Sequence, residues 1–388
     1  MTEYRFIEPF DVLHFRGNPL FGDGGAAGSA QMPPWPSVFA GALRSLMLTS
    51  AGIDPAAYAQ GRATADGDVP TALGTPDAPG AFTLETLTLA QRRGERIDPL
   101  FPLPADLQVF NGRGDGARIE LQPLEPTVLP AGIASSAPLP QTPLLRSDTR
   151  AKPLSGYWLT AEGWQQHLLG RLPAVEQCVP SSALWQLEHR LGIALDRERR
   201  STIEGQLYTS DAIRLGGSTR SVGFLVGVGG VSEGALPHSG VLRLGGDGRA
   251  ASLSQADEPG LQAPDFDAIR TAGRFRIVLT SPGIFPEGWR LPGLNDDNVW
   301  HFDGGHARLV CAAVPRGGIV SGWDLAKRQP KTAERVAPTG SVYWFEGFEG
   351  DVEALRKLAK TGLWGLSPDN DDAMRRAEGF NRFAIANA

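Results

Sequence analysis

Basic side chains recur beside glycine-rich turns, and this pattern is the clearest sign of chemistry in the sequence. Arg220 follows the run GGST, and Arg249 follows GGDG. Glycine lets an anion approach backbone N–H groups closely, and arginine supplies a planar fork of donors for phosphate oxygens. Interleaved Phe, Trp and Tyr provide flat rings on which bases stack. The pattern indicates binding of a phosphate-bearing ligand such as RNA, although each arginine alone also fits an ordinary solvated surface.

Further groups of basic residues point the same way. From Arg316 to Arg335, basic residues exceed acidic ones by three, in a chain whose formal net charge is −6. The mild overall acidity argues against coating of nucleic acid by bulk charge, but it leaves room for a local basic groove. In this segment we single out Lys327 and Lys331. We add three residues of a predicted hairpin tip and one beside the terminal strand, namely Arg197, Arg199, Arg200 and Arg382.

Acid–base and metal chemistry have weaker support. His14, at the end of the first predicted strand, and His189 are candidates for proton exchange with an RNA 2′-hydroxyl. The segment His301–His306 (HFDGGH) lies in a glycine turn and lacks a third and fourth metal ligand. The sequence contains neither an HExxH pattern nor a GxxxxGK[ST] phosphate-binding loop. We therefore expect no metal and no cofactor.

Composition bounds the architecture. The chain has 388 residues, 41% of them hydrophobic, which suffices for about two domains with a sizeable core. Its 48 glycines and 31 prolines predict many turns and long ordered loops. Cys178 and Cys311 are too few for a disulfide framework or a four-thiolate zinc site. Because we find no secretory signal and no membrane-length apolar stretch, we expect a reduced, cytoplasmic protein without membrane contact.

The order of elements suggests two related halves. Residues 4–15 are typical of a strand, a glycine loop follows to residue 31, and a helix begins with Ser37 as its expected N-cap. The polar segment 254–267 is the best domain boundary, because residues 273–282 then alternate like a new first strand. We also predict helices at 158–169, 182–191 and 352–361, and strands at 82–89, 118–121, 189–196, 205–215, 222–231, 242–253, 309–314 and 341–346.

Several segments, in their order along residues 4–386, resemble a known family. It is the third-subunit family of the Cmr module, the effector complex of type III-B CRISPR systems, within the RAMP superfamily. One departure is the segment 375–380 (RRAEGF), which keeps a single glycine where RAMP proteins often have several. The segments that carry the resemblance are FIEPFDVLHFRGNPLF, PPWPSVFAGALRSLML, FPLPADL, HRLGIALDRERRSTIEGQLYTSDAIRL, RLGGDGR, SGWDLAKRQPK, PTGSVYWFE and AEGFNRFAIA.

The resemblance implies an α+β fold with two ferredoxin-like (RRM-like) domains, long insertions and glycine-rich loops. We place these domains at residues 1–262 and 263–388. The resemblance further implies a non-catalytic RNA-binding subunit that holds the repeat-derived 5′ tag of the guide RNA (crRNA) in antiviral defence. Its implied protein partners are the large polymerase-like subunit and a backbone RAMP subunit, with target RNA met indirectly.

The resemblance adds four residues to the basic ones already named. Arg16 and Asn18 lie in the first loop, Ser37 lies at a helix N-terminus that attracts anions, and Arg44 follows on the same helix. The full set of expected RNA contacts is Arg16, Asn18, Ser37, Arg44, Arg197, Arg199, Arg200, Arg220, Arg249, Lys327, Lys331 and Arg382.

Two other functions stay open. A RAMP endoribonuclease that processes precursor crRNA would use His14 or His189, and it would leave a 2′,3′-cyclic phosphate without a metal. A sugar-binding β-rich protein is suggested by nine tryptophans, many glycines and net acidity. Cleavage abolished by a histidine substitution would favour the first, and sugar binding without retained RNA would favour the second.

Overall fold

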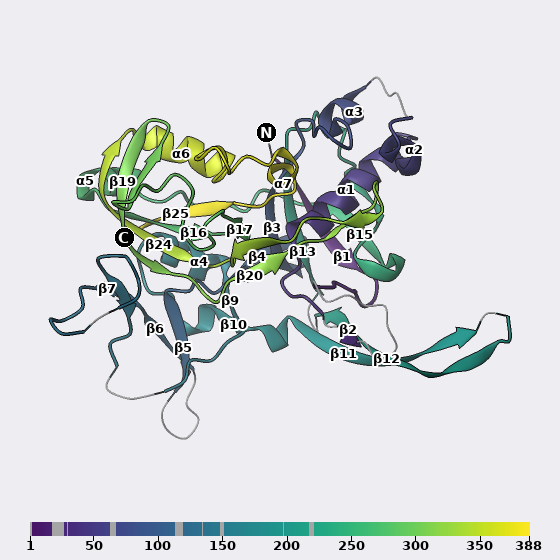
Figure 1. The fold of residues 1–388 in the computed structure, drawn as a ribbon, viewed down its shortest axis with the longest axis horizontal. Coiled ribbons are helices and arrows are strands. Elements are labelled where there is room, and N and C mark those ends of the chain that lie inside the picture. Colours follow the sequence, from purple (N-terminus) through teal and green to yellow (C-terminus); the bar gives the residue numbers. More distant parts are fainter. Residues whose placement is uncertain are drawn as a thin grey trace.

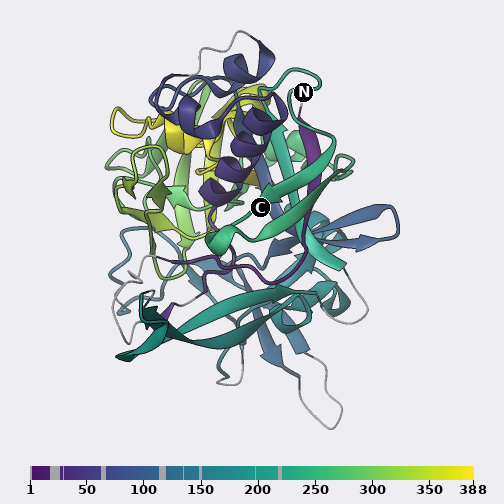
Figure 2. The same cartoon turned by 90° about the vertical axis from the view of Figure 1, so that its right-hand side faces the viewer.

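Antiparallel sheets dominate the chain, and helices are few (Figures 1 and 2). No helix in the described part of the chain is long and apolar enough to cross a membrane. Because the chain contains both helices and antiparallel sheets, the expectation of a mixed helix and strand fold is confirmed. The computed structural model describes residues 2–17, 27–28, 30–62, 67–112, 119–133, 135–147, 151–196, 198–216 and 221–388.

The largest sheet in the described chain has eight strands, all paired antiparallel. Its strand β13 is buried along most of its length, as its apolar sequence predicts. Gly223 allows β1 to approach, because a Cβ there would lie 2.4 Å from the carbonyl oxygen of Ile7. In spatial order the strands are β10 (Cys178–Pro180), β9 (Tyr157–Thr160), β4 (Arg96–Pro102), β3 (Thr83–Arg93), β13 (Ser221–Gly229), β1 (Glu3–Pro9), β15 (Ala250–Gln255) and β14 (Ser239–Arg243).

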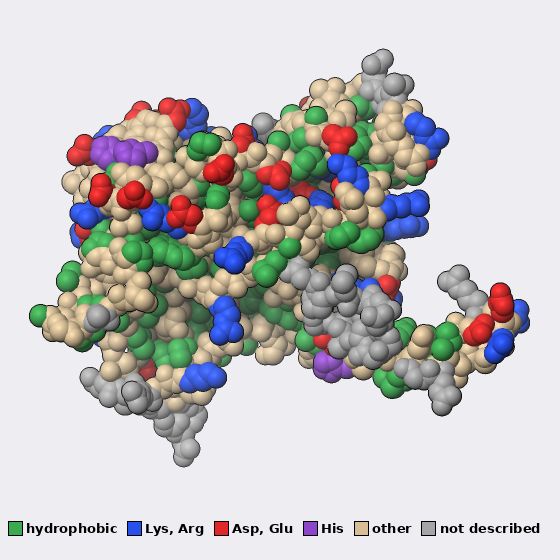
Figure 3. Space-filling model, viewed as in Figure 1, with side chains coloured by type: hydrophobic (Ala, Val, Ile, Leu, Met, Phe, Trp, Pro, Cys, Tyr) green, Lys and Arg blue, Asp and Glu red, His purple; other side chains and the backbone are tan. Residues whose placement is uncertain are grey.

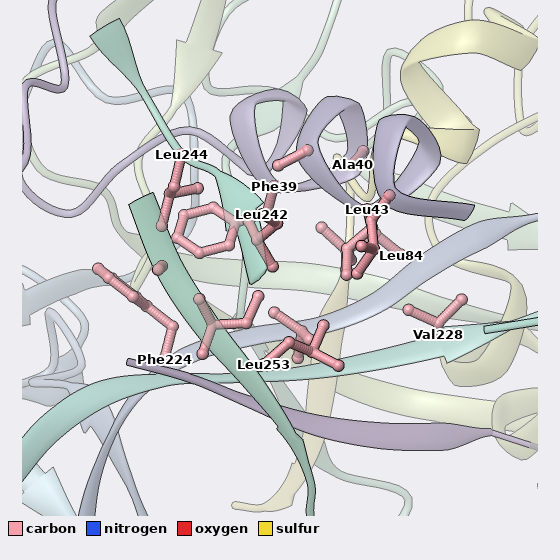
Figure 4. Close-up of a cluster of buried hydrophobic side chains, with 14 of the residues drawn as sticks. Phe39, Ala40, Leu43, Leu84, Phe224, Val228, Leu242, Leu244 and Leu253 are labelled. Carbon is pink, nitrogen blue, oxygen red and sulfur yellow. The ribbon is translucent and has the colours of Figure 1, made fainter. Parts of the chain in front are cut away.

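Helix α1 (Pro36–Ser50) packs its apolar face on this sheet. Phe39 and Leu43 are fully buried, and the ring of Phe39 lies 4.7 Å from that of Phe224 (Figure 4). Ser37 is not the N-cap, so that prediction is wrong. The cap is Trp35, and Pro36 occupies the first helical position, where its missing N–H costs nothing.

A second sheet of five antiparallel strands is built from the last third of the chain. Helix α6 (Val352–Thr361) has the predicted bounds: the Asp351 side chain caps its start, and Gly362 with φ +82° ends it. Its Leu355 and Leu358 join the aromatic core of this sheet. In spatial order the strands are β18 (Val299–Phe302), β19 (Gly305–Ala313), β24 (Val342–Gly350), β16 (Phe275–Leu279) and β25 (Phe383–Asn387).

The two sheets meet at a shared core, which we call the sheet junction. One hydrophobic cluster joins Phe101 and Trp164 to Val278 and Trp344. The sheets are therefore packed against each other by apolar burial. The division into two ferredoxin-like domains at residue 262 stays a prediction.

The remaining elements are short, apart from one long hairpin formed by β11 (Trp185–Asp196) and β12 (Ser201–Leu215). The remaining strands are β2 (Ala27–Gly28), β5 (Leu107–Asn111), β6 (Ile119–Pro123), β7 (Glu125–Thr127), β8 (Thr142–Leu144), β17 (Gly283–Ile284), β20 (Gly318–Val320), β21 (Trp323–Asp324), β22 (Gln329–Pro330) and β23 (Glu334–Ala337). The remaining helices are α2 (Pro55–Ala59), α3 (Asp68–Leu73), α4 (Ala161–Leu168), α5 (Phe266–Ala272) and α7 (Ala373–Ala377).

Two helix predictions need correction. The helix predicted at 182–191 is wrong, because β11 begins at Trp185 and its apolar residues alternate with period two. The helix predicted at 158–169 begins later: residues 157–160 form β9, and the Thr160 side chain caps α4.

Candidate nucleic-acid interface

The β11–β12 hairpin carries exposed arginines at its tip and projects from the body of the molecule (Figure 1). The side chain of Arg199 is 83% exposed, with Nε 4.0 Å from a carboxylate oxygen of Asp196. Arg200 turns the chain with φ +53° and is also exposed. Both guanidinium groups are therefore accessible to an anion. Arg197, predicted beside them, lies outside the described residues.

One face of the hairpin presents a row of exposed apolar side chains, which we call the hairpin apolar strip. Along β11, Glu188 and Arg190 are only half-buried, whereas His189, which stands in the same row as the leucines, is as exposed as they are. A free protein in water normally shows the reverse arrangement, so this face fits a surface that a partner covers. The strip consists of Leu187, Leu191, Ile193, Leu195 and Leu207, which are 45–67% exposed.

Arg16 and Arg249 come together at the turn between β14 and β15. Arg16 lies 3.4 Å from a carboxylate oxygen of Asp247, and Arg249 lies 3.4 Å from one of Asp11. Gly245 makes the turn possible because it has φ +75°, and because a Cβ at this position would lie only 2.7 Å from the carbonyl oxygen of His14. The glycine run therefore packs the turn against the first loop, and the side chains of Arg16 and Arg249 are 40% and 31% exposed.

A pocket of about 350 Å³ lies between the eight-stranded sheet and residues 280–282, 318–320 and 336–339, and we call it the junction pocket. Its walls combine the segment before α1 with residues of β3, β9 and β20. Trp35, Trp158 and Phe224 line it, together with the prolines of the PPWP motif. Half-buried polar residues, among them Gln31 and Thr339, also line it. The helix start singled out in the sequence therefore forms one wall of a cavity.

Ser37 and Lys331 lie close to each other near this pocket. A Cβ on Gly322 would lie 4.0 Å from Ser37 Oγ and 3.9 Å from Lys331 Cδ. Lys331 forms an ion pair with the buried carboxylate of Glu378 in the C-terminal segment. The structure thus brings two residues that are 294 positions apart to the same point, although Lys331 is already engaged in a contact within the protein.

The segment RRAEGF holds the β21–β23 region in place. Buried Arg375 lies 2.7 Å from Glu334 and 3.2 Å from Glu378, and it donates hydrogen bonds to the backbone oxygens of Ser321 and Thr332. Gly379, with φ +92°, lets this segment lie against β3, because a Cβ there would approach the oxygen of Leu84 to 2.6 Å. Gly379, the single glycine that this segment retains, therefore allows close packing against β3.

Arg44 and Arg382 lie mostly inside the fold. The guanidinium of Arg44 stands 5.0 Å from the ring centre of Phe82, and burial lowers its pKa. Arg382 is 7% exposed and donates a hydrogen bond to the backbone oxygen of Lys360, and burial lowers its pKa as well. Both arginines contact the protein's own core in the structure.

The other predicted contacts are dispersed. Lys327 forms an ion pair of 2.9 Å with Asp77, which raises the pKa of the lysine through their hydrogen bond and charge attraction. Asn18 and Arg220 lie outside the described residues. On the face shown in Figure 3, Lys and Arg side chains occur in separate places and at the end of the hairpin, interspersed with acidic ones. This face therefore carries several small basic points and no continuous basic band.

The two candidate catalytic histidines differ in accessibility. His14 is 4% exposed, and its Nε2 lies 3.6 Å from Asp247. His189 stands on the hairpin with its side chain 78% exposed, and its Nδ1 lies 2.6 Å from Asp211. Only His189 could reach a ligand without a rearrangement. Among the described residues, no group of three or more His, Cys, Asp or Glu could hold a metal ion.

A buried charged cluster at the sheet junction was missed by the sequence interpretation. Asp106 receives hydrogen bonds from His167, at 2.9 Å, and from Arg276. Burial by itself would raise the pKa of Asp106, but the charges and hydrogen bonds of His167 and Arg276 together hold it below its usual value. These residues are separated by up to 170 positions, so no local pattern announces them.

Comparison with known proteins identifies the class and then the family. Residues 5–387 match the family model described as CRISPR-associated protein (Cas_Cmr3). The protein is therefore CRISPR-associated, and within that class the chain belongs to the Cas_Cmr3 family. This confirms the resemblance noted in the sequence. No curated protein matches the chain significantly.

Solved structures with a similar chain come from two kinds of CRISPR complex. One is a chain of the type III-B Cmr-beta complex bound to cognate target RNA, with 16% identity, a TM-score of 0.47, and coverage of 88% of this chain and 86% of that one. Another is a chain of the Csm3–Csm4 subcomplex of a type III-A interference complex, with 11% identity, a TM-score of 0.36, and coverage of 90% and 94%.

Proposed function

We propose that this chain is a non-catalytic, RNA-binding subunit of a type III-B CRISPR effector complex in antiviral defence. In this role it holds the 5′ repeat-derived tag of the crRNA and docks the large polymerase-like subunit. A backbone RAMP subunit is its other neighbour, and target RNA meets the chain only indirectly. The observation that carries the proposal is the family match over residues 5–387.

The hairpin supports this proposal because it combines two kinds of contact in one projecting element. Arg199 and Arg200 at the tip present charge without a close buried partner, as a phosphate contact requires. The hairpin apolar strip would bury about five aliphatic side chains against a protein neighbour. We assign the tip to RNA and the strip to the neighbouring subunit.

The other accessible RNA contacts belong to the region around the junction pocket. Arg16 and Arg249 at the β14–β15 turn, Ser37 at the start of α1 and Lys331 beside it supply them. Because Lys331 lies in the proposed domain 263–388 and the other three residues lie in 1–262, a bound strand would fix the two proposed domains relative to each other.

Co-expression with the genomic neighbours, affinity purification of this chain and sequencing of the RNA that follows it test the proposal. We expect short RNAs that share a repeat-derived 5′ end, together with a large polymerase-like protein. An Arg199→Ala/Arg200→Ala variant should retain several-fold less RNA, and its affinity should depend less steeply on salt. Arg270→Ala, which removes an exposed arginine from α5, is the matched control. A chain that purifies without RNA and without partners would refute the proposal.

One observation favours a second candidate, a metal-independent endoribonuclease. The His189–Asp211 pair has the geometry of an oriented general base with its other ring nitrogen facing solvent. Incubation of the purified complex with precursor crRNA in EDTA tests this. Cleavage that leaves a 2′,3′-cyclic phosphate and disappears in His189→Gln would establish the nuclease, and intact RNA would exclude it.

A further inference from the structure

A second cavity lies beside the five-stranded sheet, and we name it the Trp289 cavity after a residue of its wall. Its volume is about 520 Å³, within the range of about 300–1,000 Å³ that is usual for binding pockets. The loop at Ala137 and Leu139 forms one part of its wall, the end of β19 another, and strands β20 and β23 a third. The cavity is therefore bounded by segments that are distant in the sequence.

The wall of the Trp289 cavity is held in place by hydrogen bonds outside the cavity itself. The hydroxyl of buried Tyr343 donates to the backbone oxygen of Trp289 at 2.7 Å. The loop is tied to the sheet as well, because the backbone N–H of Gln141 donates to the oxygen of Val310 in β19 at 3.0 Å. The cavity is therefore preformed, and an occupant would not have to order it.

The lining of the Trp289 cavity is mostly aliphatic. Among the described residues that line it, Trp289 supplies an aromatic ring, Arg335 supplies a charge, and the remaining side chains are apolar or absent. Leu139 and Val314 are half-buried, and Ile319 is 55% exposed, so the apolar wall is open to solvent. RNA bases need aromatic faces and hydrogen-bond partners. An aliphatic wall instead suits an apolar side chain that anchors a protein partner.

Positive charge is concentrated where the Trp289 cavity opens. Arg335 lines the cavity, and Arg316 stands between two lining residues in the sequence. Both arginines are exposed, and neither side chain has an ion-pair or hydrogen-bond partner in the part of the chain that the structure describes. The acidic residue closest to Trp289 in the sequence, Glu287, is already paired with Arg290 at 3.4 Å. The opening is therefore complementary to an acidic group.

We infer that the Trp289 cavity docks a segment of a neighbouring protein subunit in which a carboxylate stands beside an aromatic or large aliphatic residue. The apolar side chain fills the cavity, and the carboxylate pairs with Arg335. The inference rests on the proposed function as a subunit of a complex. It adds a docking site that shares no residue with the hairpin apolar strip.

Site-directed photo-cross-linking in the purified effector complex identifies the occupant. The photo-reactive residue p-benzoylphenylalanine replaces Ala137, an exposed residue of the cavity wall, and mass spectrometry maps the cross-linked peptides. We expect one segment of a partner protein that carries Asp or Glu next to an aromatic or large aliphatic residue. The same replacement at Val241, which is 60% exposed on β14, is the control and should not capture that segment.

A charge exchange then tests the role of Arg335. Because Arg335 is exposed, Arg335→Glu should keep the stability of the wild type, but it should weaken binding of the cross-linked subunit by about 10-fold. Replacement of the acidic residue in the captured segment by lysine should restore binding to this variant. Arg243→Glu is the matched control, because Arg243 is also exposed and has no ion-pair partner among the described residues. It should bind the subunit like the wild type.

Several results would overturn the inference and leave the proposed function standing. Cross-links from position 137 to RNA would make the cavity a nucleic-acid site. Cross-links confined to this chain, or to a partner segment without an acidic residue, would remove the predicted occupant. Unchanged binding in Arg335→Glu would exclude the charge pair. A wild-type chain that assembles with no other protein would refute the proposed function itself, and the inference with it.

Discussion

The sheet junction and the β11–β12 hairpin differ in the exposure of their charged and apolar side chains. At the junction, the buried side chains of His167 and Arg276 donate hydrogen bonds to the carboxylate of Asp106, and the apolar residues around them are buried. On the hairpin, leucines and isoleucine face solvent and the arginines at the tip have only distant partners. The comparison teaches that this chain buries its apolar and charged groups together at the junction and leaves both kinds exposed on the hairpin, as the proposed partner contacts require.

The largest expected effect comes from breaking the junction cluster. Arg276→Met leaves the buried Asp106 carboxylate without its guanidinium partner, which should lower the free energy of unfolding by about 3–5 kcal/mol. Urea denaturation followed by tryptophan fluorescence measures this loss. The control Arg270→Met removes a surface pair with Asp267 and should cost no more than about 1 kcal/mol. Equal losses in the two variants would show that the junction cluster is not a stabilising feature.

A smaller loss is expected where the C-terminal segment meets β3. Gly379→Ala places a Cβ 2.6 Å from the Leu84 oxygen and imposes φ +92° on a residue with a side chain. The strain should cost about 1–3 kcal/mol, measured as a lower midpoint of thermal or urea unfolding. Gly347→Ala also has a positive φ but open space around the new Cβ, so it isolates the steric part. If both variants lose the same stability, the contact with β3 is not tight.

The dependence of stability on pH sharpens the comparison further. Because the folded-state pKa of Asp106 is lowered, its contribution is present above the ordinary carboxyl pKa of about 4 and is lost as the pH falls through the lowered value. The difference in unfolding free energy between the wild type and Asp106→Asn should therefore be constant from pH 7 to about 5 and shrink below about pH 4. Its slope cannot exceed about 1.4 kcal/mol per pH unit. A difference that grew on acidification would contradict the assignment.

The smallest effect on stability is expected on the hairpin. Leu191→Ser/Leu195→Ser changes two exposed side chains, so the free energy of unfolding should stay within about 0.5 kcal/mol of the wild type. Affinity purification should nevertheless recover less of the neighbouring protein subunit. A large loss of stability in the isolated chain would mean that the hairpin apolar strip packs against this chain itself.

The buried thiols show which reactivity the fold suppresses. Burial raises the pKa of Cys178 to about 11 and that of Cys311 to about 12. We expect neither to react with iodoacetamide at pH 8 in the folded protein and both to react in urea, as measured by mass spectrometry. Labelling of Cys311 in the native state would reveal local opening of the second sheet.

The sequence by itself determined the elements whose patterns are local. The alternation at 273–282, the apolar run at 222–231 and the capped helix at 352–361 all appear in the structure, because period and capping depend on neighbours in the chain. The ordered motifs also determined the family. The segment 182–191 failed because a short apolar stretch fits both periods, and its strand identity depends on pairing with β12.

Only the tertiary structure decided which residues share a site. Arg276 meets Asp106, Ser37 approaches Lys331, and Arg382 is buried while Arg199 is exposed. Charge and residue type are the same in the sequence for a buried and an exposed arginine. Burial and proximity arise from the packing of two sheets whose strands come from distant parts of the chain, and no local pattern encodes that packing.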